Sequence, residues 1–222
     1  MLSKIKKTFS LFLVFFLAGF LQVLSATAET QEQLYHSAER LMEDGFYDEA
    51  KGQFEKVADL DPGNEMGLSA RLKISDVYFQ QSRFEAALQI AEKVVAENPD
   101  SYDAQFHLAC AFAKVKRYEE TAQAFAKTVE LRPEEGLGLV GQGLAVFGKG
   151  DVAPAVQIIL QAKDLFKKKR NIPWHRNVRI MVNQMKNFEK YPPKFANLWL
   201  ENNFKLVYET YAEFIFHSPI EK

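Results

Sequence analysis

The feature that most constrains this chain is a stretch of 34 residues that recurs along it. The first copy spans residues 31–64 and includes the segment GFYDEA that begins at Gly45. Similar copies span residues 68–101 and 102–135, and a weaker copy spans residues 136–169. Self-similarity at this period is typical of stacked helical repeats, in which each unit buries its apolar face against its neighbours. We therefore expect an all-α solenoid.

Each copy is predicted to form two antiparallel helices. In the first copy we expect these helices over about residues 33–44 and 47–60. Gly45 lies between them, where the end of a helix favours a residue that tolerates positive φ. Pro62 follows the second helix, which it cannot extend. The small side chain of Ala38 lets the two helices approach closely.

The same residue types keep their register through the copies. The small residue of the first helix is Ala38, Ser75, Ala109 and Gly143 in turn. This pattern resembles the tetratricopeptide repeat family over residues 29–169. The resemblance implies a right-handed superhelical solenoid of helix-turn-helix repeats, with C-terminal capping helices, in which the first helix of each pair lines a concave groove. Three extra residues, 65–67, are expected to lengthen the turn before the second copy.

If the first helices line a groove, equivalent positions in successive copies face a ligand together. The candidate groove residues are Tyr35, Glu39, Met42, Leu72, Asp76, Phe79, Phe106, Val140 and Phe147. Most of them are apolar, and the acidic ones lie toward the N-terminus. Such a groove suits an amphipathic helix or an extended segment with aromatic anchors, whereas an anionic peptide terminus would find no cation there. The alternative is that the protein's own chain covers these positions.

Beyond residue 169 the repeat pattern ends. Residues 170–222 are expected to form an aromatic-rich helical cap, with one helix over residues 172–190 and a longer one over residues 195–216. Two interpretations stay open. The cap covers the last repeat or the groove, or part of its aromatic surface binds a partner or a second copy. The candidate interface residues are Trp199, Phe204, Tyr208 and Tyr211.

Residues 1–28 have the layout of a cleavable secretory signal peptide. Three lysines precede an apolar run over residues 9–24, and small residues occupy positions 26 and 28. We expect export, most simply to the periplasm. The alternative is an uncleaved segment that holds the same domain at a membrane, facing the periplasm.

Charge is divided unevenly along the chain. The net charge of -1 argues against a nucleic-acid partner, because proteins that bind nucleic acid generally carry a basic excess. Residues 29–100 nevertheless contain 16 acids and 7 bases, and residues 163–194 contain 10 bases and 2 acids. The core of the basic stretch, residues 167–170, is interpreted first as a solvated helix end, where cations are favourable. The alternatives are a surface for an anionic membrane, for an acidic partner or for the acidic half of another copy.

The sequence contains no recognisable catalytic constellation. Phosphate-binding and nucleophile motifs are absent, and the four histidines lack metal-ligand spacing. Cys110 lies in an apolar run and is expected to be a buried packing residue. We therefore predict a non-enzymatic adaptor for protein partners, with no cofactor and no metal. The alternatives are a self-assembling homo-oligomer and a carrier of a small ligand or lipid.

Overall fold

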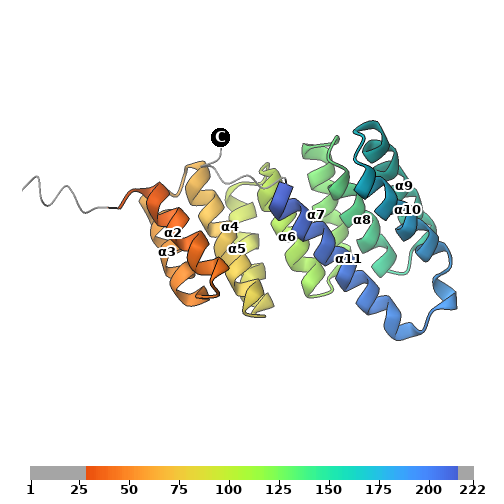
Figure 1. Cartoon of the computed structure of the whole chain (residues 1–222), viewed down its shortest axis with the longest axis horizontal. Helices are drawn as coiled ribbons and strands as arrows, with labels where there is room; N and C mark the ends of the chain where they lie inside the picture. The colour runs from red at the N-terminus through yellow and green to blue at the C-terminus, as the bar shows by residue number, and fades with distance from the viewer. Residues whose placement is uncertain (1–28, 215–222) are drawn as a thin grey trace, which may run out of the picture.

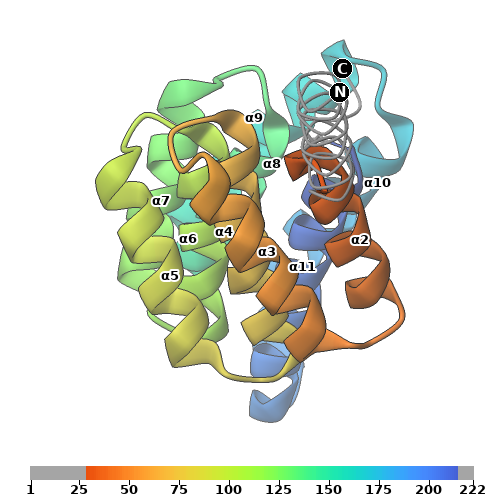
Figure 2. The same ribbon diagram turned by 90° about the vertical axis from the view of Figure 1, so that its left-hand side faces the viewer.

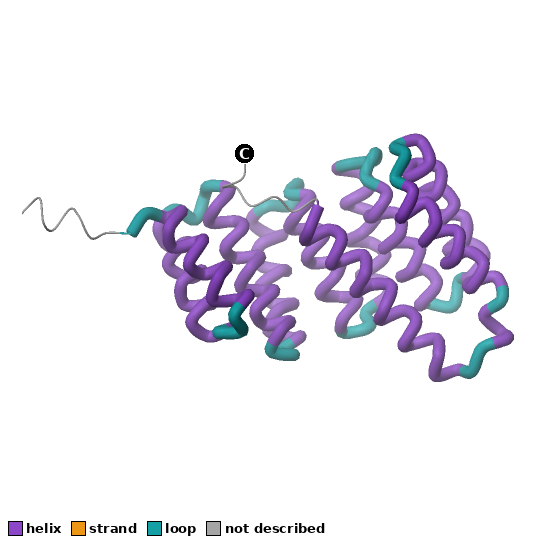
Figure 3. The backbone as a smooth tube through the Cα atoms, viewed as in Figure 1, coloured by secondary structure: helices purple, strands orange, loops and turns teal. Residues whose placement is uncertain are grey.

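The chain folds into an elongated stack of paired helices joined by short loops (Figures 1 and 3). The structure is a computed structural model and describes residues 29–214. The helices are α2 (Gln31–Glu43), α3 (Tyr47–Leu60), α4 (Glu65–Gln80), α5 (Phe84–Glu97), α6 (Tyr102–Lys114), α7 (Tyr118–Leu131), α8 (Gly136–Gly148), α9 (Val152–Lys168), α10 (Ile172–Lys186), the 3₁₀ helix η1 (Phe188–Lys190) and α11 (Pro193–Phe214). The expected signal peptide lies outside the described residues.

All four turns within the repeats close in the same way. The residue with positive φ is Gly45, Ser82, Lys116 or Gly150 in successive repeats. In the first turn, the N–H of Phe46 donates to the carbonyl of Leu41 over 2.8 Å, and the other three turns repeat this bond. This hydrogen bond satisfies a carbonyl at the end of the first helix. It therefore stabilises the turn also in the two repeats where serine or lysine takes the place of glycine.

The second repeat begins earlier than expected. Residues 65–67 form the first turn of α4 and do not extend the preceding loop. The Asn64 side chain caps this turn by accepting a hydrogen bond from the N–H of Gly67 over 2.7 Å. Asparagine is among the best residues at a helix N-cap. This cap lets α4 begin at Glu65, before the start expected for the second copy.

The C-terminal helices also differ from the expected bounds. The single helix predicted over residues 172–190 ends at Lys186, and a short 3₁₀ turn follows. α11 begins at Pro193, two residues before the expected start, because proline is tolerated at the first position of a helix.

The helices α2 to α10 pack sequentially, and α11 runs back across the stack. It contacts α8 and α6, which are far from it in sequence (Figure 1). Viewed along the stack, α11 lies on the side of α2, α4 and α6, the first helices of their repeats (Figure 2). Within residues 29–214, no helix is both long enough and apolar enough to cross a membrane.

Candidate protein-binding groove

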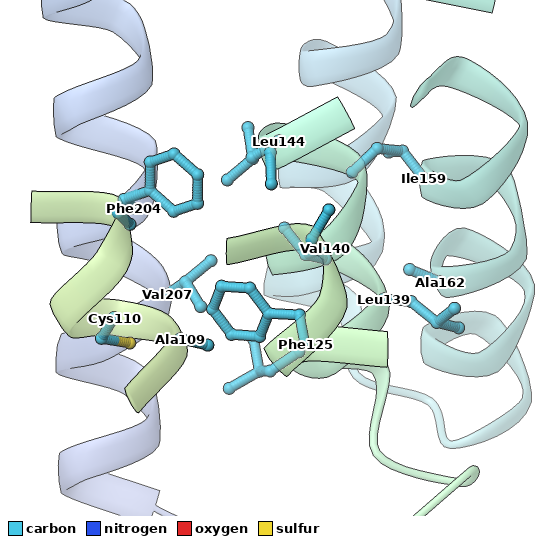
Figure 4. Packing of buried hydrophobic residues seen from close by; sticks show 14 of the residues in the cluster. Ala109, Cys110, Phe125, Leu139, Val140, Leu144, Ile159, Ala162, Phe204 and Val207 are labelled. Carbon is cyan, nitrogen blue, oxygen red and sulfur yellow. The ribbon is translucent and has the colours of Figure 1, made fainter. Parts of the chain in front are cut away.

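The C-terminal half of the concave face is occupied by α11. The ring of Tyr211 stacks on that of Phe106, with centroids 4.0 Å apart and planes 15° from parallel. Near the other end of α11, Trp199 meets Phe147 edge-on at 5.2 Å. Between these contacts, Phe204 packs toward the third and fourth repeats, as Figure 4 shows. The structure thus places α11 in the groove, which is the first of the two arrangements left open by the sequence.

The C-terminal end of α11, around Tyr211, packs on polar side chains as well as on apolar ones. The Tyr211 hydroxyl donates a hydrogen bond to Oδ1 of Asp103 over 2.7 Å. Beside it, Nε2 of His107 lies 3.3 Å from Oδ1 of Asp76, and both side chains are almost fully buried. The hydroxyl of Tyr208 also hydrogen-bonds to Asp76. Four side chains from α4, α6 and α11 thus meet at one buried junction, with Asp103 at its edge.

Electrostatics at this junction favour a charged pair. Burial opposes ionisation of His107, but the attraction and hydrogen bonding of Asp76, helped by Asp103, raise the His107 pKa above its usual value. Burial likewise acts to raise the Asp76 pKa, and the influence of His107 outweighs it, so that this pKa is lowered. Removing an ion pair from water costs free energy. This part of the α11 interface therefore contributes less net stability than its apolar part.

The N-terminal half of the concave face remains accessible. Glu39 and Met42 on α2, and Phe79 on α4, are partly exposed. Tyr35 and Leu72 are fully buried, however, and belong to the packing between helices. The residues equivalent to Tyr35 and Leu72 in the later repeats are Phe106 and Val140, and Phe147 is equivalent to Met42 and Phe79. All three of these later residues lie buried in the cluster that includes α11.

Tyr35 illustrates why this position is closed. Its hydroxyl lies 2.6 Å from Oγ of Ser69 in the next repeat, and its ring meets Phe54 edge-on at 5.4 Å. A large aromatic side chain at this position therefore joins two repeats and does not project into the groove. A role in partner binding stays a prediction for all the groove residues, and Glu39, Met42 and Phe79 are the members that the structure leaves reachable.

A cavity of about 450 Å³ lies beside α11, where the open and filled halves of the concave face meet. Its lining combines five aromatic side chains with lysine and glutamate side chains. The lining residues include Phe79, Phe84, Ala113, Lys114, Tyr118, Phe204 and Tyr208. A volume of this size is within the range of small-molecule and side-chain pockets. It extends the accessible surface of α4 toward α11.

The junction residues Asp103 and His107 were not among the sequence candidates. Both lie on α6, where His107 immediately follows the groove position Phe106. Their importance depends on α11, whose Tyr211 is 108 residues away in sequence from Asp103. The odd presence of a histidine within an apolar helix was the only available signal.

The structure offers little for metal or thiol chemistry. Within residues 29–214, no three His, Cys, Asp or Glu side chains gather where they could hold a metal ion. Cys110 is buried, as expected, and burial raises the pKa of its thiol further above the range in which the reactive thiolate forms.

Paired helices at a period near 34 residues, stacked into one array, define a helical-repeat solenoid with a concave binding face. Residues 35–102 and 72–135 each match the family described as tetratricopeptide repeat. The chain belongs to the tetratricopeptide repeat family. Tetratricopeptide repeats form protein-interaction scaffolds, and this chain has that architecture.

Solved structures with the same fold include several of MamA. One, MamA from residue 41 onward from Desulfovibrio magneticus RS-1, is 27% identical, with 63% of this chain and 77% of that chain covered and a TM-score of 0.54. A second is 23% identical over 68% of this chain and 87% of that chain, with a TM-score of 0.57. A third, 16% identical over 84% of this chain and 96% of that chain, has a TM-score of 0.56, and these last two show a shared fold alone. A comparison with curated proteins found no match.

Proposed function

We propose that this chain is a non-enzymatic, exported adaptor of the cell envelope that binds a protein partner through the N-terminal half of its concave face. The observation that carries the proposal is the position of α11. Its aromatic residues fill the groove over the third and fourth repeats, and Met42 and Phe79 remain accessible over the first two.

The character of the open half indicates the kind of partner. Met42 and Phe79 offer apolar contacts, and the cavity next to Phe79 can receive one large side chain. Glu43 adds negative charge on the exposed side of α2, and Glu39 is partly exposed beside Lys73, with which it pairs at 3.8 Å. An amphipathic helix or extended segment with an apolar anchor and neighbouring basic residues complements this surface.

Site-specific photocrosslinking in cells tests the binding surface. A photoreactive amino acid is placed at Met42 or Phe79, with a matched control at Gln89, an exposed position on the second helix of its repeat. We expect a discrete protein adduct from Met42 and Phe79 and none from Gln89. Adducts of equal yield from all three positions would show that the concave face is not the specific surface.

A second experiment bears on export. Full-length protein expressed in a Gram-negative host is fractionated, and its N-terminus is determined. We expect it in the periplasmic fraction with a new N-terminus near Glu29. Recovery of the intact N-terminus from the cytosolic fraction would contradict export, and recovery of intact protein in the membrane fraction would support the anchored alternative.

A further inference from the structure

The capping helix α10, which follows the fourth repeat, has two faces of different chemistry. One face packs against α9 and the rest of the core. Its buried residues are Trp174, Val178, Met181, Val182 and Met185. The opposite face carries Arg176, Arg179 and Lys186, with Ile172 and Ile180 among them. At 100° per residue, these five positions span roughly a third of the helix circumference.

The outer face exposes more apolar surface than a cap requires. A terminal helix keeps a solenoid soluble by presenting a polar outer side. Ile172 is 69% exposed and Ile180 is 49% exposed, however, and each stands close to an arginine on the helix surface. Packing against the last repeat accounts for neither side chain.

The positive charge of this face is unbalanced. α10 contains no aspartate or glutamate. In the adjoining basic stretch, Lys169 pairs with Glu135 at 3.3 Å and Lys163 lies 3.7 Å from Asp164. Among the described residues, the cations of α10 have no carboxylate within ion-pair distance. A capping role would be served equally well by mixed charges.

We propose that the outer face of α10 docks on an anionic phospholipid surface. Cations near such a surface are attracted to its headgroups, each strengthening binding by about fivefold at moderate salt. Exposed Ile172 and Ile180 can enter the boundary between headgroups and acyl chains, as apolar residues of interfacial helices do. A fluid membrane also tolerates a line of long flexible cations without the fixed counter-charges that a folded partner must provide.

The position of this face leaves the groove free. α10 lies at the opposite end of the stack from α2, as Figure 1 shows. A chain held through α10 would therefore present the open half of its concave face away from the point of attachment. The lipid surface is independent of the proposed partner site, so either proposal can fail without the other.

Vesicle co-sedimentation tests the proposal. The probe is vesicles of phosphatidylcholine mixed with phosphatidylglycerol, compared with vesicles of phosphatidylcholine alone. The protein is the chain from Glu29 onward, which contains every described helix and excludes the apolar segment before it. We expect binding to the anionic vesicles only, weakening as salt is added.

Three variants locate the surface. The pair Arg176→Glu with Arg179→Glu is expected to weaken vesicle binding at least about tenfold. Ile180→Ser is expected to weaken it severalfold without a change of charge. The pair Lys56→Glu with Lys93→Glu makes the same change in net charge at exposed positions of α3 and α5, and should bind like wild type apart from a small long-range effect.

Several outcomes would overturn the proposal. Wild type that fails to bind anionic vesicles, or equal losses in the α10 pair and its control, would do so. Light scattering without vesicles tests whether a second copy of this chain occupies the face instead. If wild type self-associates and the Arg176→Glu, Arg179→Glu pair is monomeric, the face belongs to a second copy. Equal binding to polyglutamate, unaffected by Ile180→Ser, would indicate a purely acidic partner.

Discussion

At the residue scale, the turns within the repeats contain a testable conformational cost. Ser82 has a φ of 58°, a region that glycine occupies readily and other residues do not. We expect Ser82→Gly to raise the free energy of unfolding by about 0.5 kcal/mol, since relief of strain exceeds the added freedom of the unfolded chain. Gly45→Ala is the reciprocal change. No atom lies within 4 Å of the added Cβ, so the expected loss of about 1 kcal/mol reports the backbone alone. Urea unfolding measures the free energy of unfolding of both variants. A Gly45→Ala variant as stable as wild type would contradict the positive φ assigned to this residue.

Also at this scale, the His107–Asp76 pair predicts a pH dependence. The raised pKa of His107 means that its contribution to stability is complete below about pH 6.5 and is lost as the pH rises through the folded-state pKa. The lowered pKa of Asp76 means that its contribution is present above about pH 4 and is lost as the pH falls through the folded-state value. The pair is therefore most stabilising between these limits.

The other titratable groups that face this pair are Lys73, Asp103, Cys110, Tyr208 and Tyr211, and burial raises the pKa of the Cys110 thiol, which stays neutral. Burial raises the pKa of both tyrosines well above 10, so they stay neutral across this range. We expect wild type to lose stability as the pH is raised above about 6.5, and His107→Gln to lose less over the same interval. Thermal unfolding across pH 5 to about 9 measures the difference. Parallel curves for the two proteins would rule out a charged histidine.

At the scale of one element, α8 depends on its glycines for close packing. A Cβ at Gly141 would lie 2.4 Å from the ring of Phe125, which is fully buried. Overpacking of this kind costs about 1–3 kcal/mol and exceeds the gain in helix propensity. We expect Gly141→Ala to destabilise the fold by about 1–2 kcal/mol. Gly52→Ala on α3 is the matched control, because nothing lies within 4 Å of its added Cβ. It should be stabilising by about 0.5–1 kcal/mol, and a neutral or stabilising Gly141→Ala would contradict the packing described here.

Among the elements, α11 is the one whose position could not be predicted from the sequence. Its aromatic residues predict a buried face, but Trp199 and Phe204 would satisfy that requirement equally in a groove or in an interface. The deciding contacts, such as Tyr211 to Asp103, join distant parts of the chain and have no local pattern. The predicted ends of some helices were wrong for a different reason. The cap at Asn64 and the end of α10 at Lys186 differ from the expected bounds by a few residues, which repeat spacing does not register.

At the scale of the whole molecule, the repeats were sufficient to predict the solenoid and its family. Helix pairs at a constant period leave few other ways to bury their apolar faces. The groove was predicted less completely, because equivalence between repeats says nothing about occupancy. Phe79 and Phe106 occupy comparable helices, yet Phe79 borders a cavity and Phe106 is stacked beneath Tyr211. The difference arises from the length and direction of α11, which only the folded chain reveals.

The placement of α11 across the concave face of the third and fourth repeats decides which half of the groove is open. Zero-length carbodiimide crosslinking followed by peptide mass spectrometry tests it directly. Nζ of Lys116, after α6, lies 3.0 Å from Oε1 of Glu201 on α11, and both side chains are about half exposed. Lys169 and Glu135, 3.3 Å apart within the solenoid, serve as the internal control. We expect an intramolecular Lys116–Glu201 bond that forms alongside the control bond at low protein concentration and disappears in urea. Formation of the Lys169–Glu135 bond without the Lys116–Glu201 bond would contradict the placement of α11.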